Sequence, residues 1–439
     1  MNQENWHIVA TRLLQELRQG ESLALSLSAE DSLFVRMTQA KVRQSSEVQQ
    51  GFVELHFFKN NRNLKITVPF TFQPEKDLQA CQEALHRCRE EAAHLPEDKF
   101  LQLPENHGQF HQDTRKKIDG YSLVDACLTK VQGSDFVGIL AAGESIRANI
   151  NSSGLNQWFG TSTFSLDFSF YAKNRQAVKG LYGGQHWQDP EFEALISRKR
   201  DQLDHLSKPL MSLEKKKYRA YFSPSAVATL VEGLSSVASR EAYQRGQCAF
   251  KKLVDAQQHL SPMFSLQENF TGGQIPPFNE MGEIAPEVLS VVEQGRFKNL
   301  LCSSRSAKEY GVASNFASQR EALRAPEILP GQLPSAKEME ALGTGIYISD
   351  LHYLNWSDIQ HGSMTGMTRF GCFWVENGQI VAPVKDLRFD ESLYHFWGAG
   401  LEGFTDKAEI HPKTGTYYQR DLGTIKAPGM LVNDFTFVL

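Results

Sequence analysis

The feature that most restricts how this chain folds is an Asn377-Gly378 pair between two apolar runs, 370–375 and 380–381. Both central residues of a type I′ turn need a positive φ angle, which asparagine and glycine adopt most readily. The pair therefore predicts a β-hairpin in which the two runs are neighbouring antiparallel strands. A glycine leaves the backbone bare, so that another chain can approach it closely. Three glycines stand ahead of the hairpin: Gly362, Gly366 and Gly371.

Strands and helices are also predicted in the first half of the chain. Runs rich in β-branched and aromatic residues cover 32–37, 51–57, 64–70, 135–140, 145–150 and 161–171. Amphipathic helices are predicted over residues 1–20, 75–94 and 118–131. In the last strand-like run, Phe164, Leu166, Phe168 and Phe170 alternate with polar residues. This alternation predicts an antiparallel sheet with one covered and one wetter face.

A charged segment, residues 190–217, separates two parts of the chain. It has a helical pattern until Pro209 and then reads as a solvated linker. At 439 residues, the chain is expected to form two or three domains. We predict an N-terminal α+β domain over 1–207 and a C-terminal β-rich domain over 208–439. A predicted central helix, 224–239, follows the first strand of the second domain.

Composition and charge argue against several classes of partner. Apolar residues make up 41% and charged residues 22% of the chain, as in ordinary globular proteins. A net charge of −5 argues against nucleic acid and anionic membranes, because both attract basic surfaces. No apolar run approaches the ~18 residues that span a bilayer. The N-terminal segment lacks the apolar core of a secretory signal, so we expect a cytoplasmic protein.

The hairpin region also resembles a longer sequence signature, W-x-E-N-G-x-I-x-x-P-V. The chain supplies Trp374, Glu376, Asn377, Gly378, Ile380, Pro383 and Val384. Further matching segments, in the same order, are 151–154, 223–228 and 427–432. The pattern is similar to that of the TldD/PmbA (TldD/TldE) family of bacterial peptidases. The resemblance implies an α+β fold in two domains, an N-terminal α/β sandwich-like domain and a C-terminal β-rich domain with a central helix.

Members of this family fall into two kinds, those with a metal site and those without. Metal-bearing members carry H-E-x-x-x-H on the central helix and a late cysteine, which together hold Zn²⁺ and activate a water molecule. Aligned on the resemblance, Val231 and Ser236 stand at the histidine positions and only Glu232 remains. No cysteine follows Cys372. The resemblance thus implies a metal-free, TldE/PmbA-like subunit with no cofactor and no catalytic residue of its own, and zinc in a TldD-type partner.

The resemblance also implies an activity for the pair of subunits. We expect this chain to be the non-metal subunit of a TldD/TldE-type metallopeptidase that hydrolyses unfolded peptides or trims leader peptides. In such a heterodimer, this chain closes the chamber and holds the peptide backbone through main-chain hydrogen bonds. The candidate backbone-binding positions are Gly272, Gly273, Gly362, Gly366 and Gly371. Tight turns or close strand packing explain these glycines equally well.

Two alternative functions stay open. One is a catalytically silent, homodimeric peptide-binding or scaffold protein. The other is a hydrolase whose site combines scattered His and Asp residues. His107 and His111 are four residues apart, but their surroundings predict a loop and not a metal-binding helix. His352 and His361 have no carboxylate partner at ligand spacing along the sequence.

Cysteines and aromatic residues complete the set of candidates. Cys81 and Cys88 are seven residues apart on a predicted helix, so we expect two core thiols on one face. Strand alternation in the C-terminal half predicts that some aromatic residues lie on an outer face that awaits a partner or a peptide. The candidates are Tyr347, Tyr353, Trp356, Phe373, Trp374, Phe396 and Trp397.

Overall fold

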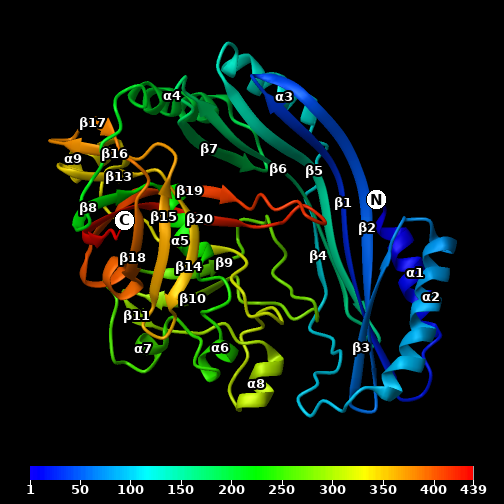
Figure 1. The fold of residues 1–439 in the computed structure, drawn as a ribbon. Coiled ribbons are helices and arrows are strands. Elements are labelled where there is room, and N and C mark those ends of the chain that lie inside the picture. Colours follow the sequence, from blue (N-terminus) through cyan, green and yellow to red (C-terminus); the bar gives the residue numbers. More distant parts are fainter. Residues whose placement is uncertain (439) are drawn as a thin grey trace.

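In the computed structural model, which describes residues 1–438, the first half of the chain forms one sheet of long, curved strands (Figure 1). The strand order is β3-β2-β1-β5-β6-β4, with β7 beside β6, and only β4 runs parallel to its neighbour. The strands are β1 (Glu21–Thr38), β2 (Lys41–Lys59), β3 (Arg62–Pro69), β4 (Phe110–Asp113), β5 (Phe136–Asn151), β6 (Asn156–Tyr171) and β7 (Ala177–Gly184).

The long strand β5 corrects one prediction. The runs 135–140 and 145–150 belong to a single strand, because the residues between them pair without a break with both β1 and β6. Another prediction is confirmed. Phe164, Leu166, Phe168 and Phe170 of β6 are all buried, as their alternation indicates.

Four helices pack on this sheet as two pairs. They are α1 (Gln3–Gln15) with α2 (Pro74–Glu91, followed by a 3₁₀ turn over Ala92–His94), and α3 (Gly120–Val131) with α4 (Asp189–His205). Trp6, Val9 and Leu13 of α1 are buried against Leu25 and Leu27 of β1. Since side chains alternate along a strand, Ser26 and Ser28 point to the opposite face, which looks toward the C-terminal half.

The C-terminal half is β-rich and contains two sheets. A ten-stranded mixed sheet has the order β11-β10-β9-β12-β20-β8-β13-β16-β17 with β19 beside β20, and a three-stranded sheet has the order β14-β15-β18. The strands of both are β8 (Lys217–Phe222), β9 (Leu266–Asn269), β10 (Val288–Glu293), β11 (Arg296–Phe297), β12 (Pro326–Ile328), β13 (Gly345–Ile348), β14 (Asp350–Asp358), β15 (Ser363–Arg369), β16 (Phe373–Glu376), β17 (Gln379–Pro383), β18 (Arg388–Ser392), β19 (Leu401–Pro412) and β20 (Thr424–Thr436).

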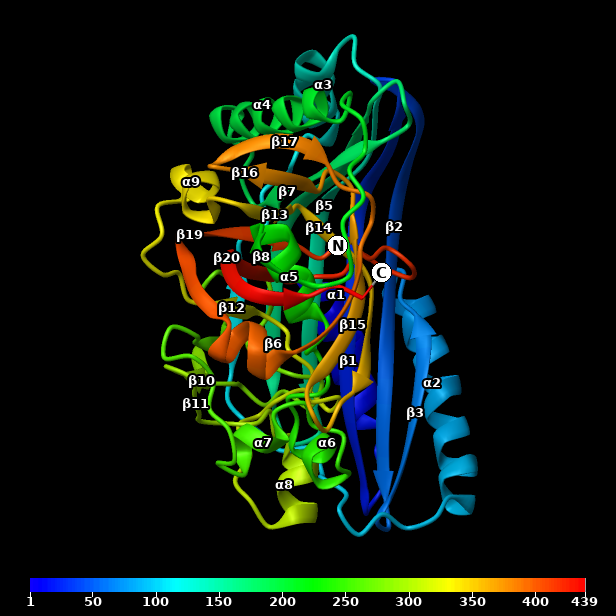
Figure 2. The same cartoon turned by 60° about the vertical axis from the view of Figure 1, so that its left-hand side comes forward.

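Short helices complete this half. They are α5 (Pro224–Glu232), α6 (Arg240–Gln244), α7 (Lys251–Val254), α8 (Ser304–Tyr310), α9 (Glu338–Leu342), a 3₁₀ turn over Ser335–Lys337 and a π turn over His395–Ala399. The central helix α5 packs against both β20 and β14 (Figure 2). It ends at Glu232 and not at 239, because Gly233 follows and the next residues form turns. Within residues 1–438, no helix is long and apolar enough to cross a membrane.

The predicted hairpin is confirmed as β16 and β17. Asn377 has a φ of 49° and Gly378 a φ of 76°, as a type I′ turn requires. The first strand begins at Phe373 and not at Phe370, because Phe370 itself has a positive φ of 63° and the chain bends there. The turn at Asn60 and Asn61 also has two positive φ angles, 51° and 55°, and joins β2 to β3.

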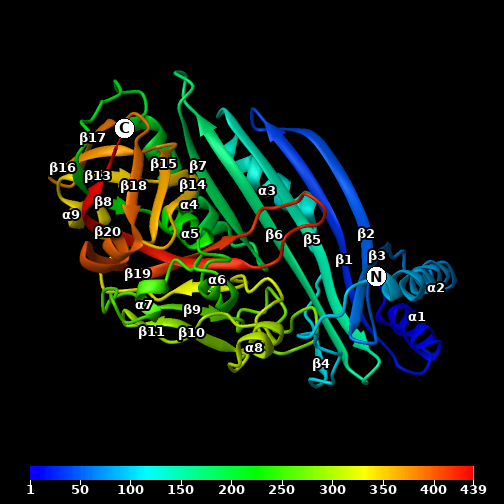
Figure 3. The same ribbon diagram turned by 60° about the horizontal axis from the view of Figure 1, so that its bottom comes forward.

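The two halves meet through α4 and through one long hairpin. Phe192 and Ile196 of α4 belong to the same buried cluster as Phe373 and Leu431 of the second half. The β19–β20 hairpin extends from the C-terminal half to the face of the N-terminal sheet (Figure 3). The α+β fold class is therefore confirmed. We propose the predicted division at 207/208 as the domain boundary, since it falls between α4 and β8.

Candidate functional site

The central helix α5 is the natural place to search for a metal site. The hydroxyl of Ser223 caps its N-terminus by accepting a hydrogen bond from the backbone nitrogen of Ala226, at 3.3 Å. Pro224 occupies the first turn, where its missing N–H costs nothing. The inward face of the helix is apolar, with Val227, Leu230 and others fully buried. The sequence therefore builds a well-defined helix whose inner face offers no metal ligands.

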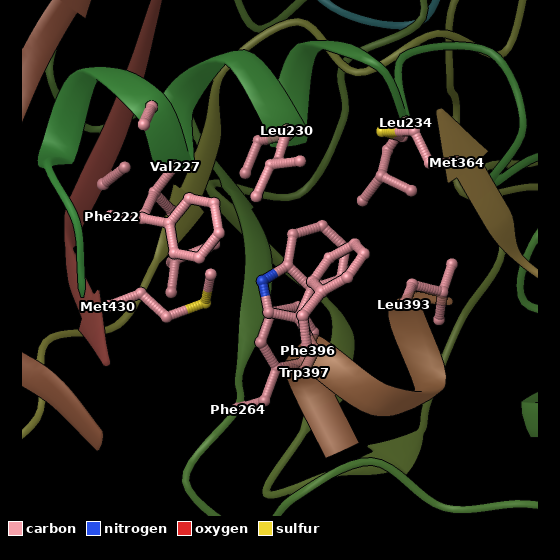
Figure 4. Packing of buried hydrophobic residues seen from close by; sticks show 14 of the residues in the cluster. Phe222, Val227, Leu230, Leu234, Phe264, Met364, Leu393, Phe396, Trp397 and Met430 are labelled. Carbon is pink, nitrogen blue, oxygen red and sulfur yellow. The ribbon is translucent and has the colours of Figure 1, made fainter. Parts of the chain in front are cut away.

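Below α5 lies a tightly packed apolar core (Figure 4). The ring centroids of Phe264 and Trp397 are 4.8 Å apart and stacked, and those of Phe396 and Trp397 are 4.8 Å apart and edge to face. Leu230 and Leu234 point toward these rings (Figure 4). Aromatic rings thus fill the space beneath the helix, so this space suits packing and not metal coordination.

The three positions taken from the metal motif do not converge. Val231 is fully buried in the apolar core, whereas Glu232 and Ser236 are exposed. Val231 offers no donor atom, and a carboxylate and a hydroxyl in solvent cannot hold a zinc ion tightly. Across residues 1–438, no group of three or more His, Cys, Asp or Glu side chains is placed to hold a metal ion.

The candidate histidines do not belong to this helix. His111 belongs to strand β4 and not to a loop, since it pairs with Trp158 of β6, while His107 precedes the strand. The expectation that His361 has no carboxylate partner was also wrong. Its Nδ1 lies 2.8 Å from Oδ2 of Asp358, three residues earlier on a sharp turn, where both side chains are exposed.

All six cysteines are buried and none forms a disulfide. Burial raises the pKa of Cys81 to about 12 and that of Cys88 to about 11, in each case with a smaller contribution from a nearby carboxylate. Both thiols lie in the core beneath α2. The prediction of core thiols is therefore confirmed.

Most of the aromatic candidates for an outer face turn out to be core residues. Tyr347 and Phe373 are buried in the cluster that α4 covers, and Phe396 and Trp397 are buried beneath α5. Strand alternation did not predict this, because other elements cover both faces of the strands that carry Tyr347 and Phe373. Phe396 and Trp397 lie in the π turn over His395–Ala399 and not on a strand. Trp356 and Trp374 are half-buried, which leaves Tyr353, 72% exposed.

The five candidate glycines divide into two groups. Gly362, Gly366 and Gly371 are buried, and a Cβ at these positions would meet neighbouring side chains of this same chain. At Gly366 that neighbour is the ring of Phe389, 2.6 Å away on the adjoining strand β18. Gly272 has open space around it. Gly273 has a φ of 61°, and a Cβ there would meet Nε2 of Gln112 at 3.1 Å. A peptide-binding role for these glycines stays a prediction, and the open space favours Gly272 among them.

A cleft that the sequence did not reveal lies between the N-terminal sheet and the loop that follows Gly273. It has a volume of about 430 Å³. Its lining residues are Ser26, Leu27, Ser28, Phe52, Glu54, Thr67, Arg147, Ala148, Asn149, Ile275, Pro276, Phe278, Asn279, Glu280, Arg324 and Leu422. The serines that alternate with leucines in residues 22–28 were a signal for its polar floor.

An ion pair holds the tip of the β19–β20 hairpin on the same sheet face. Nε of Arg420 lies 3.7 Å from Oε2 of Glu30, and the two side chains are only 5% and 2% exposed. The guanidinium also donates to the hydroxyl of Ser32 at 2.9 Å and to the carbonyl oxygens of Gly143 and Thr163 at 2.8 and 3.0 Å. Burial lowers the pKa of Arg420 to about 10, against the charge of Glu30, which raises it.

Comparison with known proteins gives a consistent result. Residues 215–438, about half of the chain, match the sequence model of the PmbA/TldA metallopeptidase C-terminal domain. The whole fold is similar to that of TldE from Thermococcus kodakarensis, at 14% identity and a TM-score of 0.76 over 99% of both chains. No curated protein matches the chain.

Two other solved structures have the same fold. Both are described as proposed modulators of DNA gyrase. One, from Thermotoga maritima, has 15% identity and a TM-score of 0.78 over 99% of this chain and all of its own. The other, from Bacteroides thetaiotaomicron, has 14% identity and a TM-score of 0.77 over 99% of both chains.

Proposed function

This chain belongs to the PmbA/TldD metallopeptidase family, and on this premise we propose that it is the non-metal, TldE-like subunit of a two-protein peptidase. A TldD-type partner supplies the zinc ion and its activated water. This chain closes the chamber and holds the backbone of an unfolded peptide or a leader peptide. The observation that carries the proposal is the central helix, whose motif positions are a buried Val231 and an exposed Glu232 and Ser236.

The packing around α5 supports this division of labour. Peptide hydrolysis at neutral pH needs an activated water or nucleophile. The space beneath α5 is filled by Phe264, Phe396 and Trp397, and the thiols of the chain are buried with pKa values raised by burial. The polar face of the N-terminal sheet and the open loop at Gly272 are suited to hold a peptide, in keeping with a binding subunit.

We expect the purified chain to hold no stoichiometric zinc. The physical reason is that Glu232 is the one potential ligand left at the motif, and a single carboxylate binds zinc weakly. Elemental analysis after mild chelation and reloading with Zn²⁺ measures the metal content. One tightly held zinc per chain would contradict the proposal and point to a site built from the scattered histidines.

Reconstitution tests the proposed function directly. Unfolded peptides are incubated with this chain, with a TldD-type partner, and with the mixture of both. We expect turnover by the mixture to exceed that of the partner alone and to stop when the partner is stripped of its metal by a chelator. The matched control replaces this chain with its heat-denatured form.

Two outcomes would overturn the two-subunit assignment. Robust, chelator-resistant turnover by this chain alone would identify a hydrolase with its own site. No change in the partner's turnover, together with a stable dimer of this chain in light scattering, would favour the catalytically silent homodimer. Such a homodimer would be about twice the 49.5 kDa mass of one chain.

A further inference from the structure

A row of side chains crosses the N-terminal sheet on the floor of the 430 Å³ cleft. Ser28 of β1 is paired with Phe52 of β2 on one side and with Arg147 of β5 on the other. Directly paired residues project from the same face of a sheet, so these three side chains are neighbours. The floor therefore places a cation and a hydroxyl beside an aromatic ring.

The opposite wall is a loop held in place by a second arginine. The guanidinium of Arg324 donates to the carbonyl oxygens of Pro276, Pro277 and Phe278 at 3.3, 3.1 and 2.8 Å. Its central carbon lies 4.6 Å from the centroid of the Phe270 ring. Because Arg324 uses its donors on this wall, it shapes the cleft and is not free to bind a ligand.

Arg147, unlike Arg324, uses few of its donors within the protein. It makes one hydrogen bond, from Nη1 to the carbonyl oxygen of Ile146 at 2.8 Å, and within residues 1–438 it forms no ion pair. Burial lowers its pKa to about 10, although the charges of Glu30 and Asp421 act to raise it. At neutral pH the guanidinium is therefore charged, half-buried and short of acceptors. Such a group gains free energy when a ligand supplies an anion.

The carboxylates that line the cleft do not pair with Arg147, so its guanidinium is available to a ligand. Glu54 is paired with Lys65 at 2.6 Å. Glu280 is exposed to solvent. The Ser28 hydroxyl makes no hydrogen bond to the described part of the chain, so it is a second available donor beside Arg147. Ile275, Pro276 and Leu422 supply apolar surface opposite these donors.

We propose that this cleft binds the C-terminal carboxylate of a peptide, with Arg147 as its bidentate partner and Ser28 as a second donor. The last side chain of the peptide then lies against Phe52 and the wall formed by Ile275 and Pro276. The volume is that of an ordinary small-ligand pocket. This inference rests on the proposed function, because it specifies how a peptide-binding subunit recognises one end of its substrate.

Fluorescence anisotropy with labelled pentapeptides tests the proposal on the full chain. Three peptides are compared: one ending in leucine with a free carboxylate, the same peptide with a C-terminal amide, and an amidated peptide ending in glutamate. We expect the free carboxylate to bind at least about tenfold more tightly than the leucine amide, because the amide leaves Arg147 unpaired. If the glutamate amide binds as tightly as the free acid, the cleft accepts any carboxylate, and the assignment to a peptide C-terminus is overturned.

Variants connect this preference to the cleft. Arg147→Gln is expected to abolish the preference for the carboxylate, and Ser28→Ala to reduce it. Arg43→Gln is the charge-matched control, since Arg43 is exposed on β2 and lies outside the cleft. Circular dichroism checks that each variant is folded. If Arg147→Gln is not folded, Arg147→Lys is used in its place, because it keeps the positive charge. Equal binding of the free acid and the amide, no binding of any peptide, or an unchanged preference in a folded Arg147→Gln chain would overturn the proposal.

The binding and reconstitution experiments distinguish a failure of the cleft proposal from a failure of the proposed function. A chain that activates its partner but shows no carboxylate preference refutes the cleft proposal alone. A chain that prefers the carboxylate but does not activate a TldD-type partner refutes the subunit assignment and leaves the cleft intact.

Discussion

Replacing Arg420 by alanine is expected to lower the free energy of unfolding by roughly 3–5 kcal/mol, because it leaves the buried carboxylate of Glu30 without its ionic partner. That carboxylate then keeps only neutral donors, including those of Ser32 and Gln50. Glu30 is 2% exposed and faces the guanidinium across 3.7 Å. The hydroxyl of Ser32 and the carbonyl oxygens of Gly143 and Thr163 lose charged donors in the same step. Urea denaturation followed by intrinsic tryptophan fluorescence measures the loss.

Two control variants separate the ion pair from other effects. Arg420→Lys keeps the charge but not the planar guanidinium, so an intermediate loss is expected. The double variant Glu30→Gln with Arg420→Ala removes the unpaired charge, and we expect it to recover part of the stability. If Arg420→Ala costs less than about 1 kcal/mol, the hairpin is not held by this pair.

The same variant should loosen the hairpin tip before the molecule unfolds. Tyr417 and Tyr418 lie at this tip and are 97% and 84% exposed. Chymotrypsin cleaves after such aromatic residues once the backbone is free, so faster cleavage at the tip is the local counterpart of the global loss. Since Leu422 lines the cleft, Arg420 also fixes part of the proposed peptide site.

Replacing Trp397 by alanine is expected to cost roughly 3–5 kcal/mol, the range for deleting a large aromatic side chain from a core. Trp397 is fully buried and stacks on Phe264, beneath α5 (Figure 4). Far-UV circular dichroism in urea is the measurement, because the substitution removes one of the fluorescent reporters.

Trp397→Phe is the matched control. It keeps an aromatic ring and removes the indole N–H, which is buried without a hydrogen-bond partner in residues 1–438. The loss should therefore be clearly smaller than for alanine. Equal losses for both variants would mean that the indole makes a contact that a phenyl ring cannot replace. A negligible loss for alanine would contradict the view that these rings form a tightly packed core beneath α5.

Local signals in the sequence determined several parts of this structure. The Asn377-Gly378 hairpin and the buried alternation from Phe164 to Phe170 followed from residues within a few positions of one another. Turn angles and strand faces depend on such neighbours, so a single sequence reveals them. The substitutions at Val231 and Ser236 are also visible in the sequence, and so the expectation of a metal-free central helix needed no coordinates.

The continuity of β5 and the burial of several aromatic residues became clear only from the tertiary structure. It joined two predicted runs into the single strand β5, because their pairing with β1 and β6 continues through the residues between them. It also placed four aromatic residues of the C-terminal half in the core. α4 covers the strand face that carries Tyr347 and Phe373, and Phe396 and Trp397 lie in a π turn beneath α5.

The cleft and the ion pair beside it depend most strongly on the complete fold. Arg147 belongs to the cleft only because the loop at Ile275 and the residue Leu422 close over its sheet. Glu30 and Arg420 are 390 residues apart in the sequence. The packing of all the elements together determines which distant segments come into contact. A short sequence pattern therefore does not predict these contacts. The sequence by itself therefore determined the family and the fold class and led to the proposal of a metal-free subunit, whereas tertiary packing formed the cleft in which we propose that a peptide binds.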